Sequence, residues 1–198
     1  MSGAVVSGAE SPAVKPLRKD AQRNRDLLLD AAAKLFAEHG VDYPLEDVAR
    51  DAGVGIGTLY RHFPTRNALV EAVYRREVAA LCESVDGLLA TLEPVDALDA
   101  WMHNFVVYVA TKRGLSATLR EMMDAEPDLF TETRANIRTA AGRVLDAAVE
   151  SGGVRPVLDA DDLVRAMSSI CMSADDPEHP ERASKLVGVL LDGMRTHH

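Results

Sequence analysis

Residues 45–64 read Leu-Glu-Asp-Val-Ala-Arg-Asp-Ala-Gly-Val-Gly-Ile-Gly-Thr-Leu-Tyr-Arg-His-Phe-Pro, and this stretch decides the fold. It predicts two short helices, at 45–52 and 56–62, joined by a Gly-Val-Gly turn. Helices that cross steeply need a small residue where their backbones meet, and Ala49 supplies it. The turn needs a residue that tolerates positive φ, and Gly53 supplies that. Apolar side chains fill the interior of this helix-turn-helix unit, namely Val48, Ala52, Val54 and Leu59.

The second helix of the unit keeps one face outside this interior set. Ile56 lies on its outward side, and the same exposed stretch contains or adjoins Gly57, Thr58, Tyr60, Arg61 and His62. Such a face fits the major groove of DNA, where arginine pairs with guanine or phosphate and tyrosine contacts a thymine methyl or a phosphate. We therefore expect DNA binding, with a helical hairpin that has no partner as the alternative.

Helical periodicity extends outward on both sides of this unit. A first helix is expected from residue 17 or 20 to 39, ended by Gly40. Residues 1–19 are expected to form a disordered basic arm. Thr65 is predicted to be the N-cap of a long helix at 66–91. Further helices are predicted at 94–112, 115–125, 128–150, 159–173 and 181–195, with Gly114 as a helix breaker. The fold class is all-α, with about nine helices and no strand.

The net charge of -9 is unevenly distributed. Acidic and basic residues balance in residues 1–80, so the whole deficit lies in residues 81–198. A basic start and an acidic remainder suit a protein that meets phosphates at one end only. No apolar run is long enough to span a membrane and no secretory signal is recognisable, so we expect a cytoplasmic protein. Cys82 and Cys171 have no metal-ligand spacing, so neither a metal nor another cofactor is expected.

Three blocks of the sequence resemble the TetR family of bacterial transcriptional regulators. They are Val-Ala-Arg-Asp-Ala-Gly-Val at 48–54, Gly-Thr-Leu-Tyr-Arg-His-Phe-Pro-Thr-Arg at 57–66, and Ala-Leu at 68–69. The resemblance implies a homodimer whose residues 20–80 form the DNA-binding domain. It implies that residues 81–198 form a helical bundle for ligand binding and dimerisation.

The resemblance also assigns roles to single positions. It implies base reading by Ile56, Gly57, Thr58, Tyr60 and Arg61, and phosphate contacts by Tyr60, His62, Thr65 and Arg66. Arg50 is a further candidate for either contact. The sequence departs from many members at Gly55-Ile56-Gly57, where a polar residue is common, so readout is expected to depend more on Thr58 and Arg61.

The acidic part carries candidate groups for a small hydrophobic or amphipathic effector. Large, adaptable or amphipathic side chains suit an irregular apolar pocket, and plain core packing is the alternative reading. His103 and Tyr108 are the preferred groups for orienting a ligand. The full set is Trp101, His103, Phe105, Tyr108, Met122, Met123 and Met167.

The last two predicted helices carry apolar stripes that are expected to form a four-helix interface with a second copy. One stripe is Leu163, Ala166, Met167 and Ile170, and the other is Leu186, Val187, Leu190 and Leu191. Packing inward is the alternative for each stripe.

The expected function is a repressor that binds a palindromic double-stranded operator as a dimer and is released by a small-molecule effector. A DNA-binding or interaction dimer without an effector is the alternative. An all-α enzyme is disfavoured because no histidine follows a glutamate at the Glu-x-x-His spacing of di-metal bundles. The sequence also has no Gly-x-Ser-x-Gly motif, no phosphate-binding glycine loop and no His-Glu-x-x-His motif.

Overall fold

The computed structural model describes residues 14–125, 127–174 and 181–196. These residues form nine α-helices and no strand, which confirms the all-α prediction. The helices are α1 (Val14–His39), α2 (Leu45–Asp51), α3 (Ile56–His62), α4 (Arg66–Thr91), α5 (Pro94–Gly114), α6 (Ser116–Ala125), α7 (Pro127–Glu150), α8 (Ala160–Ser173) and α9 (Arg182–Met194). None of the described helices is long and apolar enough to cross a membrane.

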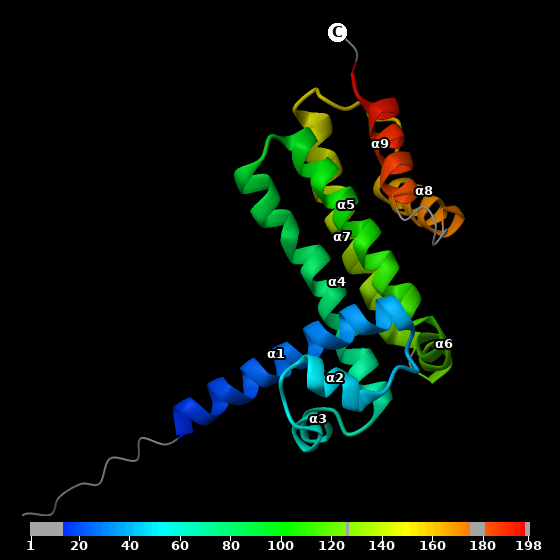
Figure 1. Ribbon diagram of the computed structural model, residues 1–198. Helices are drawn as coiled ribbons and strands as arrows, with labels where there is room; N and C mark the ends of the chain where they lie inside the picture. The colour runs from blue at the N-terminus through cyan, green and yellow to red at the C-terminus, as the bar shows by residue number, and fades with distance from the viewer. Residues whose placement is uncertain (1–13, 126, 175–180, 197–198) are drawn as a thin grey trace, which may run out of the picture.

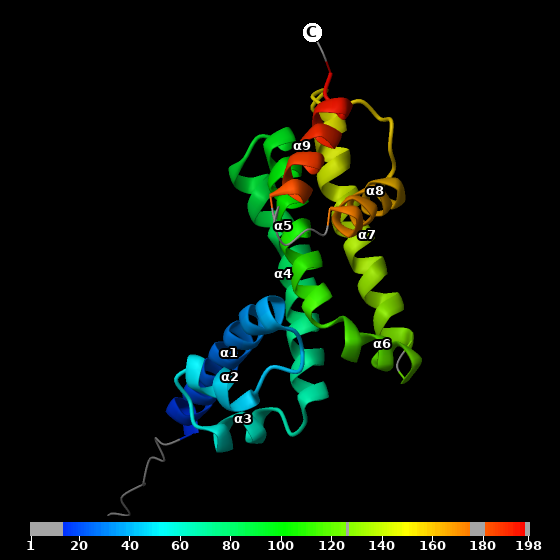
Figure 2. The ribbon, with the colours of Figure 1, turned by 45° about the vertical axis from the view of Figure 1, so that its right-hand side comes forward.

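The three N-terminal helices lie at one end of the molecule, and α8 and α9 lie at the other (Figure 1). The long helices α4, α5 and α7 pack against one another and connect the two ends (Figure 2). Helix α1 packs against α4 and α5 as well as α2, so the N-terminal helices share a continuous apolar core with the bundle. The direction of α3 in space therefore depends on how α1 and α4 pack against α5.

Local signals set most helix ends. Gly40 and Gly53 adopt positive φ, of 84° and 68°, where the chain leaves α1 and turns from α2 to α3. The Thr65 side chain accepts a hydrogen bond from the Ala68 backbone N–H at the start of α4, at 3.1 Å. The Asp159 carboxylate caps α8 in the same way. The Thr65 cap is the one predicted from the sequence.

One sequence prediction about a helix end is wrong. Helix α1 begins at Val14, so residues 14–19 are helical and only 1–13 of the predicted disordered arm lie outside the described residues. Pro16 does not prevent this, because proline is tolerated in the first turn of a helix. The prediction for Gly114 is confirmed, because α5 ends at this residue and α6 begins at Ser116.

Gly114 has a tertiary role. A Cβ atom at this position would lie 2.1 Å from the backbone oxygen of Phe36 in α1. Only a residue without a side chain lets α5 approach the backbone of α1 this closely, so Gly114 is required by packing between the N-terminal helices and the bundle.

Candidate DNA-binding interface

The helix-turn-helix unit has the interior that its sequence predicts. Val48, Ala49 and Leu59 are almost entirely buried between α2 and α3. The Val54 backbone N–H donates to the Ala49 carbonyl at 3.0 Å, and this bond closes the turn around Gly53. The unit therefore holds α3 at a fixed angle to α2.

The outer face of α3 consists of Ile56, Gly57, Thr58, Tyr60 and Arg61. Ile56 is 37% exposed and Tyr60 is 46% exposed, although both are large apolar or aromatic side chains. Gly57 and Arg61 are also exposed, and Thr58 is half-buried. A Cβ atom added at Gly57 would meet no atom within 4 Å. This face is apolar at its start and cationic at its end, and nothing in the described chain covers it.

The predicted phosphate-contacting residues have different surroundings. His62 is half-buried at the end of α3. The Arg66 guanidinium donates through Nη1 to the carbonyls of Val41 and Tyr43, at 2.5 and 2.7 Å. Arg66 thus ties the start of α4 to the α1–α2 connector, a structural role that sequence reasoning missed. Arg50 is exposed on α2 and pairs with the Asp47 carboxylate.

A groove of about 500 Å³ lies beside α3, between α1 and α4. At its edge, the Arg25 guanidinium lies over the Phe63 ring, 5.4 Å from the ring centroid. Arg25 was not among the predicted contact residues, although it belongs to a run of five cations at residues 15–25. The lining residues are Arg25, His62, Phe63, Ala68, Glu71, Ala72, Arg75 and Arg76.

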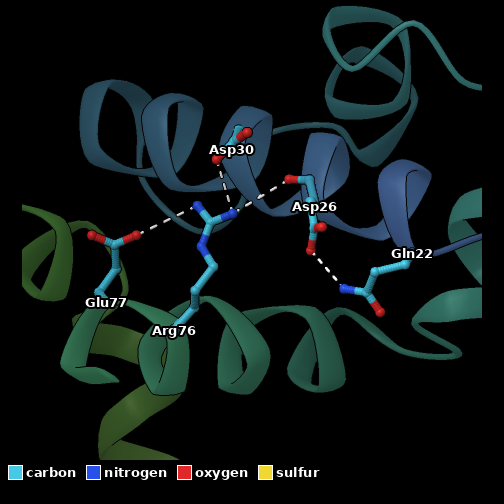
Figure 3. Close-up of polar contacts among 5 residues, drawn as sticks. All are labelled: Gln22, Asp26, Asp30, Arg76 and Glu77. Atoms are coloured by element: carbon cyan, nitrogen blue, oxygen red, sulfur yellow. Dashed lines mark hydrogen bonds and ion pairs between the residues drawn. The ribbon is translucent and has the colours of Figure 1, made fainter. Parts of the chain in front are cut away.

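Arg76 joins α4 to α1 next to this groove (Figure 3). Its Nη1 atom lies 2.9 Å from the Asp30 carboxylate and donates to the Asp26 carbonyl at 3.3 Å. Its Nη2 atom lies 3.5 Å from the Glu77 carboxylate. Asp26 and Asp30 lie on successive turns of α1, so the contacts with Arg76 hold α1 at a fixed angle to α4.

The candidate effector residues fall into separate environments. Trp101 and Met167 expose no surface, so no void that a water molecule could enter borders them. Phe105, Tyr108 and Met122 are nearly as buried. The burial of these side chains therefore favours core packing over a ligand pocket.

His103 is not brought together with Tyr108. Its ring is half-exposed, and Nδ1 lies 2.9 Å from the Asp99 carbonyl and 3.4 Å from the Asp99 carboxylate. Both partners belong to the preceding turn of α5, so the histidine lies on the surface of that helix. The side chain of Met123 lies outside the described residues.

Tyr108 belongs to a buried polar cluster with Tyr74 and Thr133. The Tyr74 hydroxyl lies 3.0 Å from Thr133 Oγ1, which in turn donates to the Phe130 carbonyl. Burial raises the pKa of Tyr108 far above its ordinary value, and the neighbouring Tyr74 hydroxyl raises it further. Tyr108 therefore remains a neutral hydrogen-bonding group at physiological pH.

The two predicted C-terminal stripes are partly internal. Leu163, Met167, Val187 and Leu191 are buried within the protomer. Leu186, a member of the second stripe, is 40% exposed. Two apolar side chains outside the stripes are more exposed, namely Met172 on α8 at 68% and Val189 on α9 at 67%.

Comparison with known protein families finds a match for each half of the chain. Residues 28–73 match the family described as bacterial regulatory proteins of the tetR family, and residues 93–196 match the C-terminal domain described as transcriptional regulator SbtR-like. An HTH-type transcriptional regulator of Staphylococcus aureus (strain USA300) is 41% identical over 63 residues, 31% of this chain and 34% of that protein. The matched part thus spans about a third of the length of that curated relative.

Solved structures extend the match to almost the whole chain. A TetR transcriptional regulator from Streptomyces coelicolor is 42% identical, with a TM-score of 0.81, over 88% of this chain and 99% of that one. A TetR transcription regulatory protein from Mycobacterium vanbaalenii is 35% identical, with a TM-score of 0.73, over 91% of this chain and 100% of that one. The chain therefore belongs to the TetR family of transcriptional regulators.

Proposed function

We propose that this regulator is a repressor that binds a palindromic operator as a homodimer, in the bacterial cytoplasm, and is released by a small-molecule effector. In this proposal residues 20–80 bind DNA and residues 81–198 bind the effector and form the dimer. The observation that carries the proposal is the uncovered outer face of α3. A large apolar and a large aromatic side chain lie exposed there, next to a cation.

On the proposed operator, the outer face of α3 enters the major groove. Arg61 donates to a guanine or a phosphate, and Tyr60 contacts a thymine methyl or a phosphate. Ile56 offers only apolar contact, and the neighbouring glycines offer no side chain. His62, Arg25 and Arg50 lie at the edges of this face, where the sugar–phosphate backbone would pass.

The test starts from in vitro selection of bound duplexes, which is expected to return a palindrome. With a selected duplex, Arg61→Ala is expected to weaken specific binding by about 1–3 kcal/mol while affecting a scrambled duplex less. Arg143→Ala is the matched control, since it removes the same charge from the exposed surface of α7. Equal losses of affinity in the two variants would contradict a base-reading role for Arg61.

The dimer is proposed to form through α8 and α9. The exposed Met172, Leu186 and Val189 support this, because a terminal helix pair with outward apolar side chains is suited to a four-helix interface. Replacing Met172 and Val189 together by glutamate is expected to give a folded monomer in analytical ultracentrifugation. A double variant that stays dimeric would place the interface elsewhere.

Release by an effector is proposed as a population shift. A ligand that prefers a dimer whose α3 helices are wrongly spaced lowers operator affinity, since half-sites one turn apart need a spacing of about 34–36 Å. Helix α4 supports this coupling because it runs from α3 into the bundle and packs against α5 and α7.

A regulator without an effector is the second candidate. The full burial of Trp101 and Met167 favours it, since a ligand in that region would have to displace packed side chains. A ligand screen separates the two: a compound that both raises the melting temperature and releases the operator supports the effector model.

A further inference from the structure

The N-terminal part of α1 extends beyond the packed core of the molecule. Residues 19–23 are all exposed, and Leu28 is the first buried residue among the described side chains of α1. Figure 1 shows this end of α1 projecting past α2 and α3, at the end of the molecule away from α8 and α9. Residues 19–23 are therefore placed to contact a partner outside the protomer.

This exposed segment is cationic. Residues 15–25 contain five cations and a single acid. Within the described part of the chain, the side chains of Lys19 and Arg23 form no ion pair and no hydrogen bond. By contrast, Arg75 and Arg76 on α4 both pair with carboxylates. Lys19 and Arg23 are about one turn apart, where like charges repel each other, so an anionic partner would relieve this repulsion.

Helical spacing places both cations on the face of α1 that meets α4. Lys19 precedes Asp26 by seven residues, and Arg23 precedes Asp30 by the same number. Seven residues are close to two turns, and Asp26 and Asp30 both contact α4. Gln22 lies on this face as well, because its amide donates to the Asp26 carboxylate at 2.8 Å (Figure 3). The two cations therefore project on the side of α1 where α4 begins.

The groove beside α3 adjoins the exposed segment. Arg25 follows Arg23 by two residues and lies over the Phe63 ring at the end of α3. Cations from two helices line the groove, namely Arg25 of α1 and Arg75 and Arg76 of α4. A polyanion that contacts the outer face of α3 would therefore pass next to residues 19–23 as well.

We propose that Lys19 and Arg23 bind the sugar–phosphate backbone of the operator outside the half-site that α3 reads. This deepens the proposed function and rests on it, since the operator is the polyanion that reaches this end of the molecule. Both side chains donate to phosphate oxygens, which carry no sequence information. From Lys19 to Leu28 the helix rises about 14 Å, which matches about four base pairs along a duplex.

Duplexes of two lengths test the proposal. The short duplex ends at the outer base pairs of the selected palindrome, and the long duplex adds about six base pairs of unrelated sequence at each end, which exceeds the reach of the segment. The wild type is expected to bind the long duplex at least about tenfold more tightly at low salt. A long duplex with a different flanking sequence should bind equally well, because the contact is to phosphates.

The double variant Lys19→Gln/Arg23→Gln assigns this gain to the two cations. It is expected to lower affinity for the long duplex about tenfold and to change affinity for the short duplex by less than about twofold. The slope of log affinity against log salt concentration should fall by about one for each cation, and thus by about four for a dimer. The variant should melt like the wild type in circular dichroism, since both side chains are exposed.

Two further variants serve as controls. Lys19→Arg/Arg23→Lys keeps both charges and should bind the long duplex like the wild type. Arg138→Gln/Arg143→Gln removes the same number of charges from the exposed surface of α7 and should also leave the affinity unchanged.

Three results would overturn the flanking contact. The first is an equal loss of affinity for both duplexes in the Lys19→Gln/Arg23→Gln variant. The second is an equal loss in the α7 control. The third is an unchanged affinity for the long duplex, which would assign the cations to another anionic partner.

The Arg61→Ala variant distinguishes failure of this proposal from failure of the proposed function. If Arg61→Ala keeps the operator preference while Lys19→Gln/Arg23→Gln loses affinity only for the long duplex, base reading by Arg61 is refuted and the flanking contact is upheld. The opposite pattern refutes the flanking contact alone.

Discussion

Replacing Gly114 by alanine tests how the N-terminal helices are attached to the bundle. The added methyl carbon would lie 2.1 Å from the Phe36 oxygen, 2.7 Å from the Phe36 carbonyl carbon and 2.8 Å from the Ala37 Cα atom. All three are backbone atoms of α1, which cannot rotate away as a side chain can. The two helices must therefore separate by roughly 1 Å, and overpacking of this kind costs about 1–3 kcal/mol.

Urea unfolding followed by circular dichroism measures this cost. Gly87→Ala is the control, because a Cβ atom there would meet no atom within 4 Å and alanine favours the helix by up to about 1 kcal/mol. The displaced α1 should also change the angle of α3 and weaken operator binding more than the stability loss alone explains. A Gly114→Ala variant as stable as the wild type would refute the close-packing argument.

Three further predictions concern single side chains. Arg66→Ala should lower the free energy of unfolding by about 2 kcal/mol in the absence of DNA, since it leaves the Val41 and Tyr43 carbonyls without their donor. If the stability is unchanged, Arg66 has no structural role and only its predicted contact with DNA remains. Asp159→Ala should cost about 1 kcal/mol through loss of the α8 cap, whereas Asp159→Asn should cost less. The pKa of Tyr108 is raised in the folded protein, so the unfolded chain loses this proton first, from about pH 10 upward, and folding stability falls there. The difference in unfolding free energy between the wild type and Tyr108→Phe should therefore shrink by about 1.4 kcal/mol per pH unit above that point. A difference that does not change with pH would contradict the raised pKa of Tyr108.

The helix-turn-helix unit and the long helix after it could be predicted closely because their limits are local. Gly53 at positive φ separates α2 from α3, and Thr65 caps α4 from the position directly before its first residue. These signals act within four residues of the chain, so they need no knowledge of the tertiary structure.

Features that depend on a distant partner could not be predicted in this way. Gly114 has the local signature of a helix end, and only the position of α1 shows that it also lets another backbone approach. From the sequence alone Arg66 is expected to be a surface cation, but its guanidinium donates hydrogen bonds to carbonyls of the α1–α2 connector.

The misplacement of His103 could have been avoided from the sequence. Trp101, Phe105 and Tyr108 follow the four- and three-residue spacing of one helix face, and all three are buried. His103 is two residues from Trp101, which is a rotation of about 200° around the helix. The helical spacing alone therefore places His103 on a different face from Trp101, Phe105 and Tyr108. The prediction relied on the apolar composition of α5 and did not apply this spacing.

The glycines around the start of α3 differ in how freely they can change. Gly53 needs its positive φ, so substitution there strains the turn. Gly55 and Gly57 have ordinary backbone angles and open space where a side chain would grow, and Gly55 occupies the N-cap position, where serine or asparagine would add a capping hydrogen bond. A single substitution at either position would add new chemistry to the proposed DNA-facing surface without damage to the fold. The protein can thus acquire a different operator preference by point mutation while its bundle, and whatever the bundle recognises, stays the same.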